Sequence, residues 1–196
     1  MSAPDSGEQD LQDMARLNAG HDAALNALMD RHAERLFHYL FRQLNNETEA
    51  AELAQEAFVR IYHHRDRFQP EQSFSTWLYT IATNLLRDRL RWRRRHPQVS
   101  LDTDDEETGA LKDVLPDSAP SPSDQTDANE RAVEVRNAIS SLPDDLRTAV
   151  ILSEYDGLPH REIAAVLNCS AKAVESRLYR ARAHLRKRLE SLLQPG

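Results

Sequence analysis

Apolar residues recur at intervals of three and four along most of the N-terminal half of the chain. This spacing predicts amphipathic helices over 21–43, about 48–61 and about 75–94. The pair of asparagines at 45–46 ends the first helix, and we expect Thr48 to be the N-cap of the second. The pattern therefore predicts a bundle of consecutive helices in this half of the chain.

The C-terminal half carries a second set of helical repeats. We expect helices over about 129–140, from Leu142 to a stop at Gly157, over 160–167 and over 171–190. The last two are joined by a very short turn, which is the spacing of a helix-turn-helix unit.

A proline- and aspartate-rich stretch separates the two sets of helices. Residues 97–128 contain four prolines and no sustained apolar period, which is typical of a linker. The sequence thus predicts an all-α fold of two small helical domains, 11–96 and 129–193, joined by a flexible acidic linker. We expect the polar residues 1–10, which lack the apolar core of a signal peptide, to form a disordered tail.

The composition narrows the chemistry that the chain can carry. Gly is scarce, at 5 residues, which favours helices over sheet. The single cysteine, Cys169, excludes an intrachain disulfide and a cysteine-rich metal site. No apolar stretch approaches about 20 residues, so we expect no direct membrane insertion.

Charge is segregated along the chain, although its formal net value of −7 argues superficially against binding nucleic acid. Residues 87–95 hold six arginines against one aspartate, and residues 171–190 hold seven basic residues against two acidic ones. Residues 101–130 hold ten acidic residues against one lysine. Because the local field decides phosphate affinity, the two basic stretches predict two nucleic-acid contacts.

The residues around the short turn fit a helix-turn-helix unit in detail. Ile163 and Leu167 fall on one face of the first helix, and Val174 falls on the facing side of the second. Asn168 stands where the turn needs a left-handed backbone, which Asn tolerates better than most residues. Ser170 is the expected N-cap of the second helix.

The outward side of the second helix carries the candidate DNA-binding residues. A helix fits the major groove, where residues near its N-terminal end reach base edges. The readers proposed on this basis are Lys172, Ser176 and Arg177, and the phosphate contacts are Arg180 and Arg182. A helical hairpin with a solvated basic face is the alternative.

Aromatic residues gather just before and within the first arginine-rich stretch. Phe68, Phe74, Trp77 and Tyr79 precede it, and Trp92 lies inside it. Aromatic rings beside cations suit single-stranded nucleic acid, because bases stack on the rings while arginine neutralises phosphate. The alternative is that Trp77 belongs to the core and that the arginines form a solvated face.

The spacing of the two basic stretches indicates a reader of two separated DNA elements. A tether of about 30 residues reaches roughly 100 Å when it is extended. Two sites roughly 20–25 base pairs apart, at about 3.4 Å per step, lie within that reach.

Three segments resemble those of extracytoplasmic-function (ECF) sigma factors, a compact branch of the sigma-70 family. ELAQEAFVRIYHH is similar to the polymerase-binding helix of that family, and FSTWLYTIATNLLRDRLRWRRR is similar to its −10 helix. LPDDLRTAVILSEYDGLPHREIAAVLNCSAKAVESRLYRARAHLR is similar to its −35-binding domain. The order of the three segments also matches the family.

The resemblance implies a role for individual residues. Its polymerase-binding residues are Gln55, Glu56 and Arg60. Its −10 residues are Phe68, Trp77, Asn84, Asp88 and Arg91, with Phe68, Asn84 and the 69–73 loop forming a pocket for a flipped base. Its −35 residues are the five residues named above on the last helix.

The chain departs from the family in the 69–73 loop. There, Pro70-Glu71-Gln72 replaces a glycine-containing sequence that is common in the family.

The resemblance also implies partners and a location. We expect the chain to bind core RNA polymerase and promoter DNA in the cytoplasm, and to be held by an anti-sigma factor. It implies no cofactor, no metal and no catalytic residue.

Two other classes of protein are weighed against this interpretation. A conventional helix-turn-helix regulator accounts for the C-terminal half, but its N-terminal half should show a sensing or dimerising domain. An enzyme needs a catalytic constellation, and His160-Arg161-Glu162 lacks the Pro-Cys-x-x-Cys partner of zinc deaminases. A phosphate-binding glycine-rich loop is also missing from the sequence.

Overall fold

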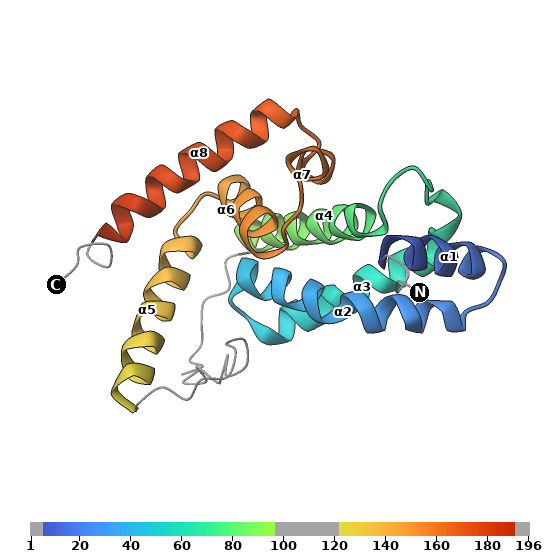
Figure 1. Ribbon diagram of the computed structural model, residues 1–196, viewed down its shortest axis with the longest axis horizontal. Helices are drawn as coiled ribbons and strands as arrows, with labels where there is room; N and C mark the ends of the chain where they lie inside the picture. Colours follow the sequence, from blue (N-terminus) through green and yellow to red (C-terminus); the bar gives the residue numbers. More distant parts are fainter. Residues whose placement is uncertain (1–5, 97–121, 191–196) are drawn as a thin grey trace, which may run out of the picture.

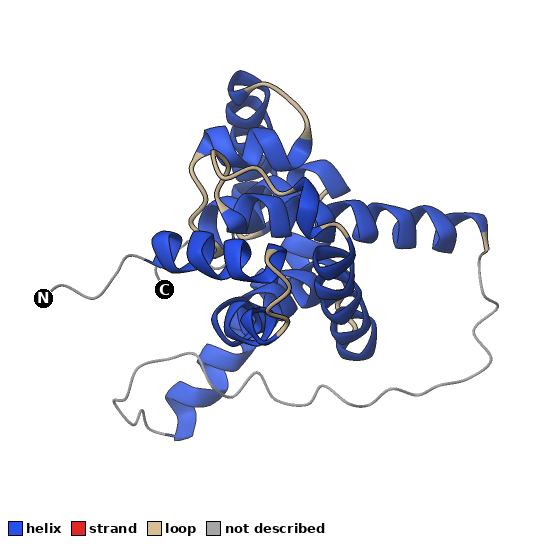
Figure 2. Ribbon diagram, turned by 90° about the vertical axis from the view of Figure 1, so that its right-hand side faces the viewer, coloured by secondary structure: helices blue, strands red, loops and turns tan. Residues whose placement is uncertain are grey.

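All regular secondary structure is helical within residues 6–96 and 122–190, which are the residues that the computed structural model describes. The helices are α1 (Ser6–Asn18), α2 (Ala23–Leu44), α3 (Glu47–His63), α4 (Phe74–Arg95), α5 (Pro122–Ser140), α6 (Asp144–Val150), α7 (His160–Leu167) and α8 (Ala171–Arg188). A 3-10 turn, η1 (Arg65–Arg67), follows α3, and a π-helical turn, η2 (Ile151–Tyr155), continues α6. The predicted all-α class is confirmed (Figures 1 and 2).

Helices α1 to α4 form the N-terminal bundle, which lies on the right of Figure 1. The helical repeat of apolar residues places one face of each helix in a shared core. The core includes Leu28, Leu36, Tyr39, Ala57, Ile61, Leu78 and Leu86, each no more than 1% exposed. The Tyr39 hydroxyl, which is buried there, lies 2.8 Å from Oγ1 of Thr83, so this polar group keeps a partner inside the core.

Side-chain caps set the starts of α3 and α4. Oδ1 of Asn46 accepts a hydrogen bond from the backbone N–H of Glu49 at 2.9 Å, and Oγ of Ser73 accepts one from Thr76 at 3.2 Å. Thr48, the expected cap of the second helix, therefore lies inside the first turn of α3. That prediction was wrong because Asn46, two residues earlier, offers an equally good capping oxygen.

Helix α1 begins inside the segment that we expected to be a tail. Residues 1–5 of that segment lie outside the described residues, whereas residues 6–10 form the first turns of α1. Met14 and Leu17 enter the core at 1% and 0% exposed, and Asp10 is buried at 4% exposed. The expectation fails for residues 6–10 because this helix buries carboxylates whose partners lie elsewhere in the chain.

Helices α5 to α8 form the C-terminal domain. The helix-turn-helix pair, α7 and α8, packs on α6 and η2 through a buried core that includes Leu146, Ile151, Ile163, Val174 and Leu178. Gly157 has a φ of +66° after η2, a conformation that favours glycine, so the expected stop is confirmed. Helix α5 starts at Pro122, so residues 122–128 of the expected linker are helical, and residues 97–121 lie outside the described residues.

The two domains pack against each other, chiefly through α4 and α7. Figure 1 shows α6 and α7 lying over α4, with α8 on the far side of the C-terminal domain. Helix α2 also contacts η2 and α5. The structure is thus a closed arrangement, in which the helices that carry the two basic stretches are separated by one layer of helices.

Candidate nucleic-acid interface

The helix-turn-helix turn has the backbone that its sequence predicts. Asn168 adopts the left-handed region, with φ 51° and ψ 54°, and the Cys169 N–H donates to the Ala164 carbonyl at 2.9 Å. Oγ of Ser170 accepts a hydrogen bond from the Ala173 N–H at 3.2 Å, so the predicted N-cap is confirmed. Local hydrogen bonds therefore fix the angle at which α8 leaves the turn.

The candidate −35 residues on α8 fall into two groups. Lys172, Ser176 and Arg180 are exposed on the outer side of the helix. Arg177 is turned into the domain, where Nη2 lies 3.2 Å from Oδ2 of Asp145 and Nη1 lies 3.1 Å from Sγ of Cys169. Arg182 forms an ion pair with Glu154 at 2.8 Å. Two of the five candidates thus have partners within the C-terminal domain.

Tyr179 is an exposed residue on the same helix that the sequence analysis left out. Its side chain is 77% exposed, the largest exposed fraction of any large apolar or aromatic residue in the described part of the chain. It follows Ser176 by three positions, so the helical repeat places it beside the candidate readers. Helical spacing was the signal that could have found it.

Four of the candidate −10 residues share one face of α4. Trp77, Asn84, Asp88 and Arg91 are separated by seven, four and three positions, which returns to the same side of a helix. Asn84, Asp88 and Arg91 are exposed, and Asp88 and Arg91 form an ion pair. The structure therefore brings these residues together as a stripe.

Phe68 and Trp77 belong to an aromatic cluster at the N-terminal end of this stripe. Phe68 is 8% exposed, and its ring centroid lies 5.3 Å from that of Trp77 and 6.4 Å from that of Phe74. Trp77 is only partly buried against the core. Phe68 is thus mainly a packed residue, while Trp77 both packs and reaches the surface.

Acidic neighbours neutralise part of the arginine-rich end of α4. Arg89 lies 3.6 Å from Glu49 and 3.4 Å from Glu52, and Arg93 lies 2.5 Å from Glu49. All three distances join a guanidinium nitrogen to a carboxylate oxygen. The formal charge of this stretch therefore overstates the positive charge that it offers to phosphate.

The candidate polymerase residues lie beside the −10 stripe. Gln55 is exposed, and Arg60 Nε forms an ion pair with Glu56 at 2.9 Å. A surface groove of about 610 Å³ runs between α3 and α4 and is lined by Glu52, Leu53, Glu56, Arg60, Leu85, Asp88, Arg89, Arg91, Trp92 and Arg95. One groove thus joins side chains that the sequence analysis assigned to two separate contacts.

Two carboxylates of the C-terminal domain dock on the start of α4. The Tyr79 hydroxyl donates to Oδ1 of Asp156 at 2.7 Å, and Arg35 donates to the Asp156 carbonyl at 3.0 Å. Oε2 of Glu162 accepts hydrogen bonds from Oγ1 of Thr76 at 2.7 Å and from Oγ of Ser73 at 3.2 Å. Hydrogen bonds of this kind tie α4 to η2 and α7.

Asp156 is a buried acid at the centre of this interface. It is 7% exposed, and its Oδ2 atom has no hydrogen-bond partner. Burial raises the pKa of Asp156 above its ordinary value of 3.8, although the hydrogen bond from Tyr79 acts in the opposite direction. Burial also raises the pKa of Tyr79, and the neighbouring Asp156 carboxylate adds to that effect.

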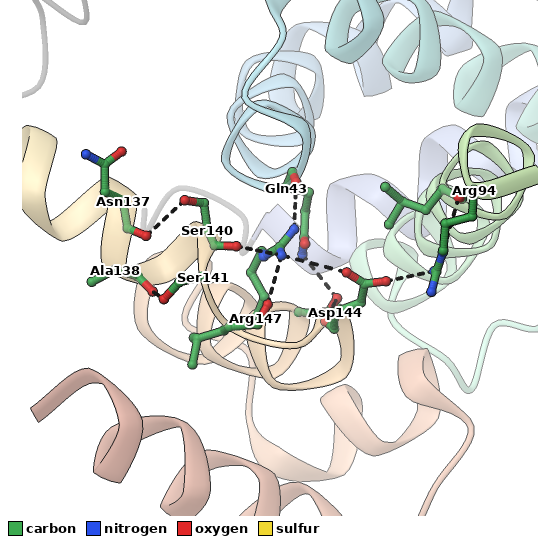
Figure 3. A network of polar contacts seen from close by, with 11 residues as sticks. Gln43, Arg94, Asn137, Ala138, Ser140, Ser141, Asp144 and Arg147 are labelled. Carbon is green, nitrogen blue, oxygen red and sulfur yellow. Dashed lines mark hydrogen bonds and ion pairs between the residues drawn. The ribbon is translucent and has the colours of Figure 1, made fainter. Parts of the chain in front are cut away.

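Arg147 links the two domains at the other end of the interface. Figure 3 shows its guanidinium group between Gln43 and Ser140. It donates to the carbonyls of Gln43 at 3.1 Å, Ser140 at 2.8 Å and Leu142 at 2.8 Å. Burial lowers the pKa of Arg147 below its ordinary value. Nearby, Arg94 of the arginine-rich stretch forms an ion pair with Asp144 at 2.9 Å.

Metal-binding clusters and membrane-spanning helices are both absent from residues 6–96 and 122–190. These residues contain no group of three or more His, Cys, Asp or Glu side chains arranged to hold a metal ion. None of the helices in the same residues is both long enough and apolar enough to span a bilayer.

Two family models match the two domains. The model of sigma-70 region 2 matches residues 28–96, and the model of sigma-70 region 4 matches residues 132–185. Helix α1 lies outside the matched segments, and so does α5 before residue 132.

Relatives with known roles match over nearly the whole chain. The RNA polymerase sigma-H factor of Pseudomonas aeruginosa is 35% identical over 192 residues, which covers 95% of this chain and 97% of the relative. The ECF RNA polymerase sigma factor SigW of Bacillus subtilis is 34% identical over 180 residues, covering 90% of this chain and 95% of the relative.

Two solved structures share the arrangement of helices. CnrH in complex with the cytosolic domain of CnrY has a TM-score of 0.69 and 27% identity, covering 93% of this chain and 98% of CnrH. The sigma factor RpoE of Bartonella quintana in complex with the anti-sigma factor NepR has a TM-score of 0.63 at 22% identity, covering 84% of this chain and 96% of RpoE, and supports the fold alone. The chain belongs to the sigma-70 family and, within it, to the ECF RNA polymerase sigma factors.

Proposed function

We propose that this chain binds core RNA polymerase, recognises −35 and −10 promoter elements and promotes DNA melting for transcription initiation. The observation that carries the proposal is the presence of two helical domains, each with its own exposed basic helix, in the order of sigma-70 regions 2 and 4. A conventional helix-turn-helix regulator is disfavoured because the N-terminal half is a region 2 bundle rather than a sensing domain.

Helix α8 is the proposed reader of the −35 element. Lys172 and Ser176 lie in its first turns, which are the turns that reach base edges in the major groove. Arg180 and Arg182 follow and contact phosphates, after Arg182 releases Glu154. Arg177 reads a base after it leaves Asp145, so its role can be tested by changing either residue of that ion pair.

Helix α4 is the proposed reader of the −10 element. Asn84, Asp88 and Arg91 present hydrogen-bonding groups along one exposed face. Phe68, Asn84 and the 69–73 loop form a pocket for a flipped base at the end of that face, with Trp77 beside Phe68. Flipping costs a few kcal/mol, and stacking on aromatic rings at about 1–3 kcal/mol per base offsets it.

The groove between α3 and α4 is the proposed contact with polymerase. Glu56 and Arg60 of α3 line this groove. Gln55 and Val59, which are exposed on the same helix, extend the proposed contact beside it. Since the same groove reaches Asp88 and Arg91, polymerase bound there lies directly beside the −10 element.

The two domains separate when the chain engages a promoter. Packed helices have axes 8–10 Å apart, so α8 lies roughly 20 Å from α4 where α7 is sandwiched between them. Two elements about 20–25 base pairs apart are about 70–85 Å apart along the helix axis. The closed arrangement is therefore the proposed state of the chain when it is free of DNA. We propose that an anti-sigma factor binds the chain in this state, in the cytoplasm.

Run-off transcription tests the proposal. The purified chain, added to core polymerase with a library of genomic templates, should yield transcripts that start at defined promoters. Asn84→Ala should weaken use of the downstream element, whereas the matched change Asn26→Ala, at an exposed position of α2, should leave it unchanged. Absence of any promoter-dependent transcript would contradict the proposed function.

A further inference from the structure

Helix α1 is tied to the rest of the bundle by a buried charged cluster. Nε2 of His32 lies 2.9 Å from both carboxylate oxygens of Asp10, and Nε of Arg31 donates to Oδ1 of Asp10 at 2.9 Å. Arg31 Nη2 also donates to Oδ2 of Asp13 at 2.8 Å. The Asp10 side chain is 5% exposed and the His32 side chain 12% exposed, so both lie away from solvent.

The imidazole of His32 continues this cluster into the aromatic residues. Its ring centroid lies 5.0 Å from that of Phe74. Phe74 in turn lies 6.4 Å from both Phe68 and Trp77, and Phe68 lies 5.3 Å from Trp77, measured between ring centroids. The rings form one continuous assembly that begins at the carboxylate of α1.

Helix α1 reaches the same region by a second route. It packs against η1, the turn that leads directly into Phe68 and the 69–73 loop, and it also contacts α4. Helix α1 therefore supports the segments on both sides of the 69–73 loop. It contacts η1 before the loop, and through His32 it supports Phe74 after the loop.

We propose that Asp10 and His32 are positioning residues for the −10 base pocket, holding Phe74 so that Phe68 and Trp77 keep the geometry that a flipped base requires. This inference rests on the proposed function of that pocket and assigns its support to a helix outside the matched region 2 segment. Neither residue touches the base. They act by fixing the rings that do.

The charged residues of the cluster are better explained by a role in orienting the His32 ring than by a role in attaching α1 to the bundle. Met14 and Leu17 already bury the apolar face of α1 at 1% and 0% exposed. Apolar packing alone can attach such a helix, and buried ion pairs are weak evidence for added stability because both charges lose their hydration. Hydrogen bonds between the imidazole nitrogen and the Asp10 carboxylate fix the orientation of the ring. The groups of a binding site must be held to within about 0.5 Å.

The chain provides a matched control for the test. Asp13, like Asp10, is a buried carboxylate of α1 that pairs with Arg31, and its other partner is Arg16 rather than His32. Asp10→Ala and Asp13→Ala each remove one carboxylate from the same helix. Only Asp10→Ala removes the partner of the imidazole.

The first measurement is the fluorescence of Trp77 in the free full-length chain. Trp92 is the second of 2 tryptophans, so Trp92→Phe leaves Trp77 as the sole tryptophan, and selective excitation of tryptophan reports on it alone. Asp10→Ala should shift the emission of Trp77 to longer wavelength, as the ring gains solvent and mobility. Asp13→Ala should leave the emission at its original wavelength.

The second measurement is the binding of a single-stranded −10 oligonucleotide by the polymerase holoenzyme. Asp10→Ala should weaken this binding about tenfold, with less than about a twofold change in affinity for core polymerase. Asp13→Ala should change both affinities by less than about threefold. His32→Ala, which keeps both Arg31 ion pairs, should reproduce the Asp10→Ala result and serves as the test if Asp10→Ala fails to fold.

The outcomes separate the inference from the function on which it rests. Equal effects of Asp10→Ala and Asp13→Ala, or unchanged Trp77 emission in both Asp10→Ala and His32→Ala, would overturn the positioning role. If the wild-type holoenzyme binds no −10 oligonucleotide, the proposed function is overturned instead. The fluorescence of the free chain still decides the positioning role in that case.

Discussion

Arg177 on α8 can contact a DNA base only by giving up the contacts that its side chain makes within the domain. Its guanidinium group bonds to Asp145 and Cys169, and the side chain of Asp145 is 60% exposed. An ion pair with so exposed a partner contributes only about 0.2–1 kcal/mol. A base edge in the major groove, at about 1–3 kcal/mol, can therefore compete for the same guanidinium.

Substitution of each partner distinguishes base reading from internal support. Arg177→Ala should weaken holoenzyme binding to a −35 duplex by about 1–3 kcal/mol, because a bidentate base contact is lost. Asp145→Ala should change that binding by less than about 0.5 kcal/mol, because it only frees the guanidinium. Fluorescence anisotropy with labelled duplex measures both, and equal losses would make Arg177 a support that holds α8 against α6.

Residues whose roles are set by their immediate neighbours could be predicted from the sequence. Asn168 and Ser170 have the conformation and the hydrogen bond expected of them, because both are dictated by a three-residue turn. The contacts of Arg177 and Arg182 could not be predicted, since their partners Asp145 and Glu154 are 32 and 28 positions away. A basic residue on a helix surface carries no local sign of such a partner.

Helices with a clear apolar repeat were predictable as elements, and α1 was not. The apolar positions of α1 are few, and its buried face contains Asp10 and Asp13 alongside Met14 and Leu17. Carboxylates at buried positions look like a solvated tail in the sequence. Arg31 and His32 on α2, which pair with these carboxylates, make this face compatible with burial. Because α1 was not predicted, the contact of its Asp10 with His32, beside the aromatic cluster, could not be predicted either.

The N-cap of α8 provides a test at the level of one element. Ser170→Ala removes the acceptor for the Ala173 N–H and should lower the free energy of unfolding by about 1 kcal/mol. Ser176→Ala makes the same chemical change at an exposed position six residues later and should leave stability unchanged. Urea denaturation of the free chain measures both values.

The same two variants should behave differently toward DNA. If Ser176 contacts a base, Ser176→Ala weakens −35 binding without loss of stability. Ser170→Ala should weaken −35 binding only to the extent that it destabilises α8. Loss of stability in Ser176→Ala would show that its hydroxyl has a role within the fold, contrary to this assignment.

The packing of the two domains depends on polar contacts between residues that are far apart in the sequence. The sequence indicated two domains and a tether, but the contacts of Asp156 and Glu162 with α4 join residues 77 and 86 positions apart. Polar groups on two separate surfaces have no shared pattern in the sequence. The closed arrangement could therefore be seen only in the structure.

Asp156 should make the stability of the closed chain depend on pH. Because burial raises its pKa in the closed structure, that structure binds more protons than a chain in which Asp156 is exposed. The stabilisation from its protonated form is complete below the ordinary value of 3.8 and is lost as pH rises through the raised value. Titration of this group thus favours opening as the solution becomes less acidic.

Asp156→Asn removes that titration while keeping the shape of the side chain. Its free energy of unfolding, relative to that of the wild type, should rise as pH increases from about 4 toward 7. Glu134→Gln, a neutralised acid at an exposed position of α5, should show no such trend. Urea denaturation across this range gives both differences, and a flat Asp156→Asn curve would mean that the buried carboxylate is not the titrating group.

Tyr79 offers a way to open the molecule without changing its charge. Tyr79→Phe removes the hydroxyl that donates to Asp156, leaving both carboxylate oxygens of Asp156 without a hydrogen-bond donor in the closed arrangement. An unsatisfied buried group costs about 1–3 kcal/mol, and water satisfies it once the domains separate. The ring itself keeps its edge contact with Tyr39, so the N-terminal bundle should remain folded.

Distances between spin labels on the two domains measure this opening directly. Labels at Ala51 on α3 and Ala183 on α8, both exposed, report the separation after Cys169→Ser removes the native thiol. Tyr79→Phe should lengthen the distance distribution, whereas Tyr62→Phe, whose hydroxyl bonds to Asp22 within the N-terminal bundle, should not. An unchanged distribution in Tyr79→Phe would mean that the remaining contacts between the domains hold them together without this hydrogen bond.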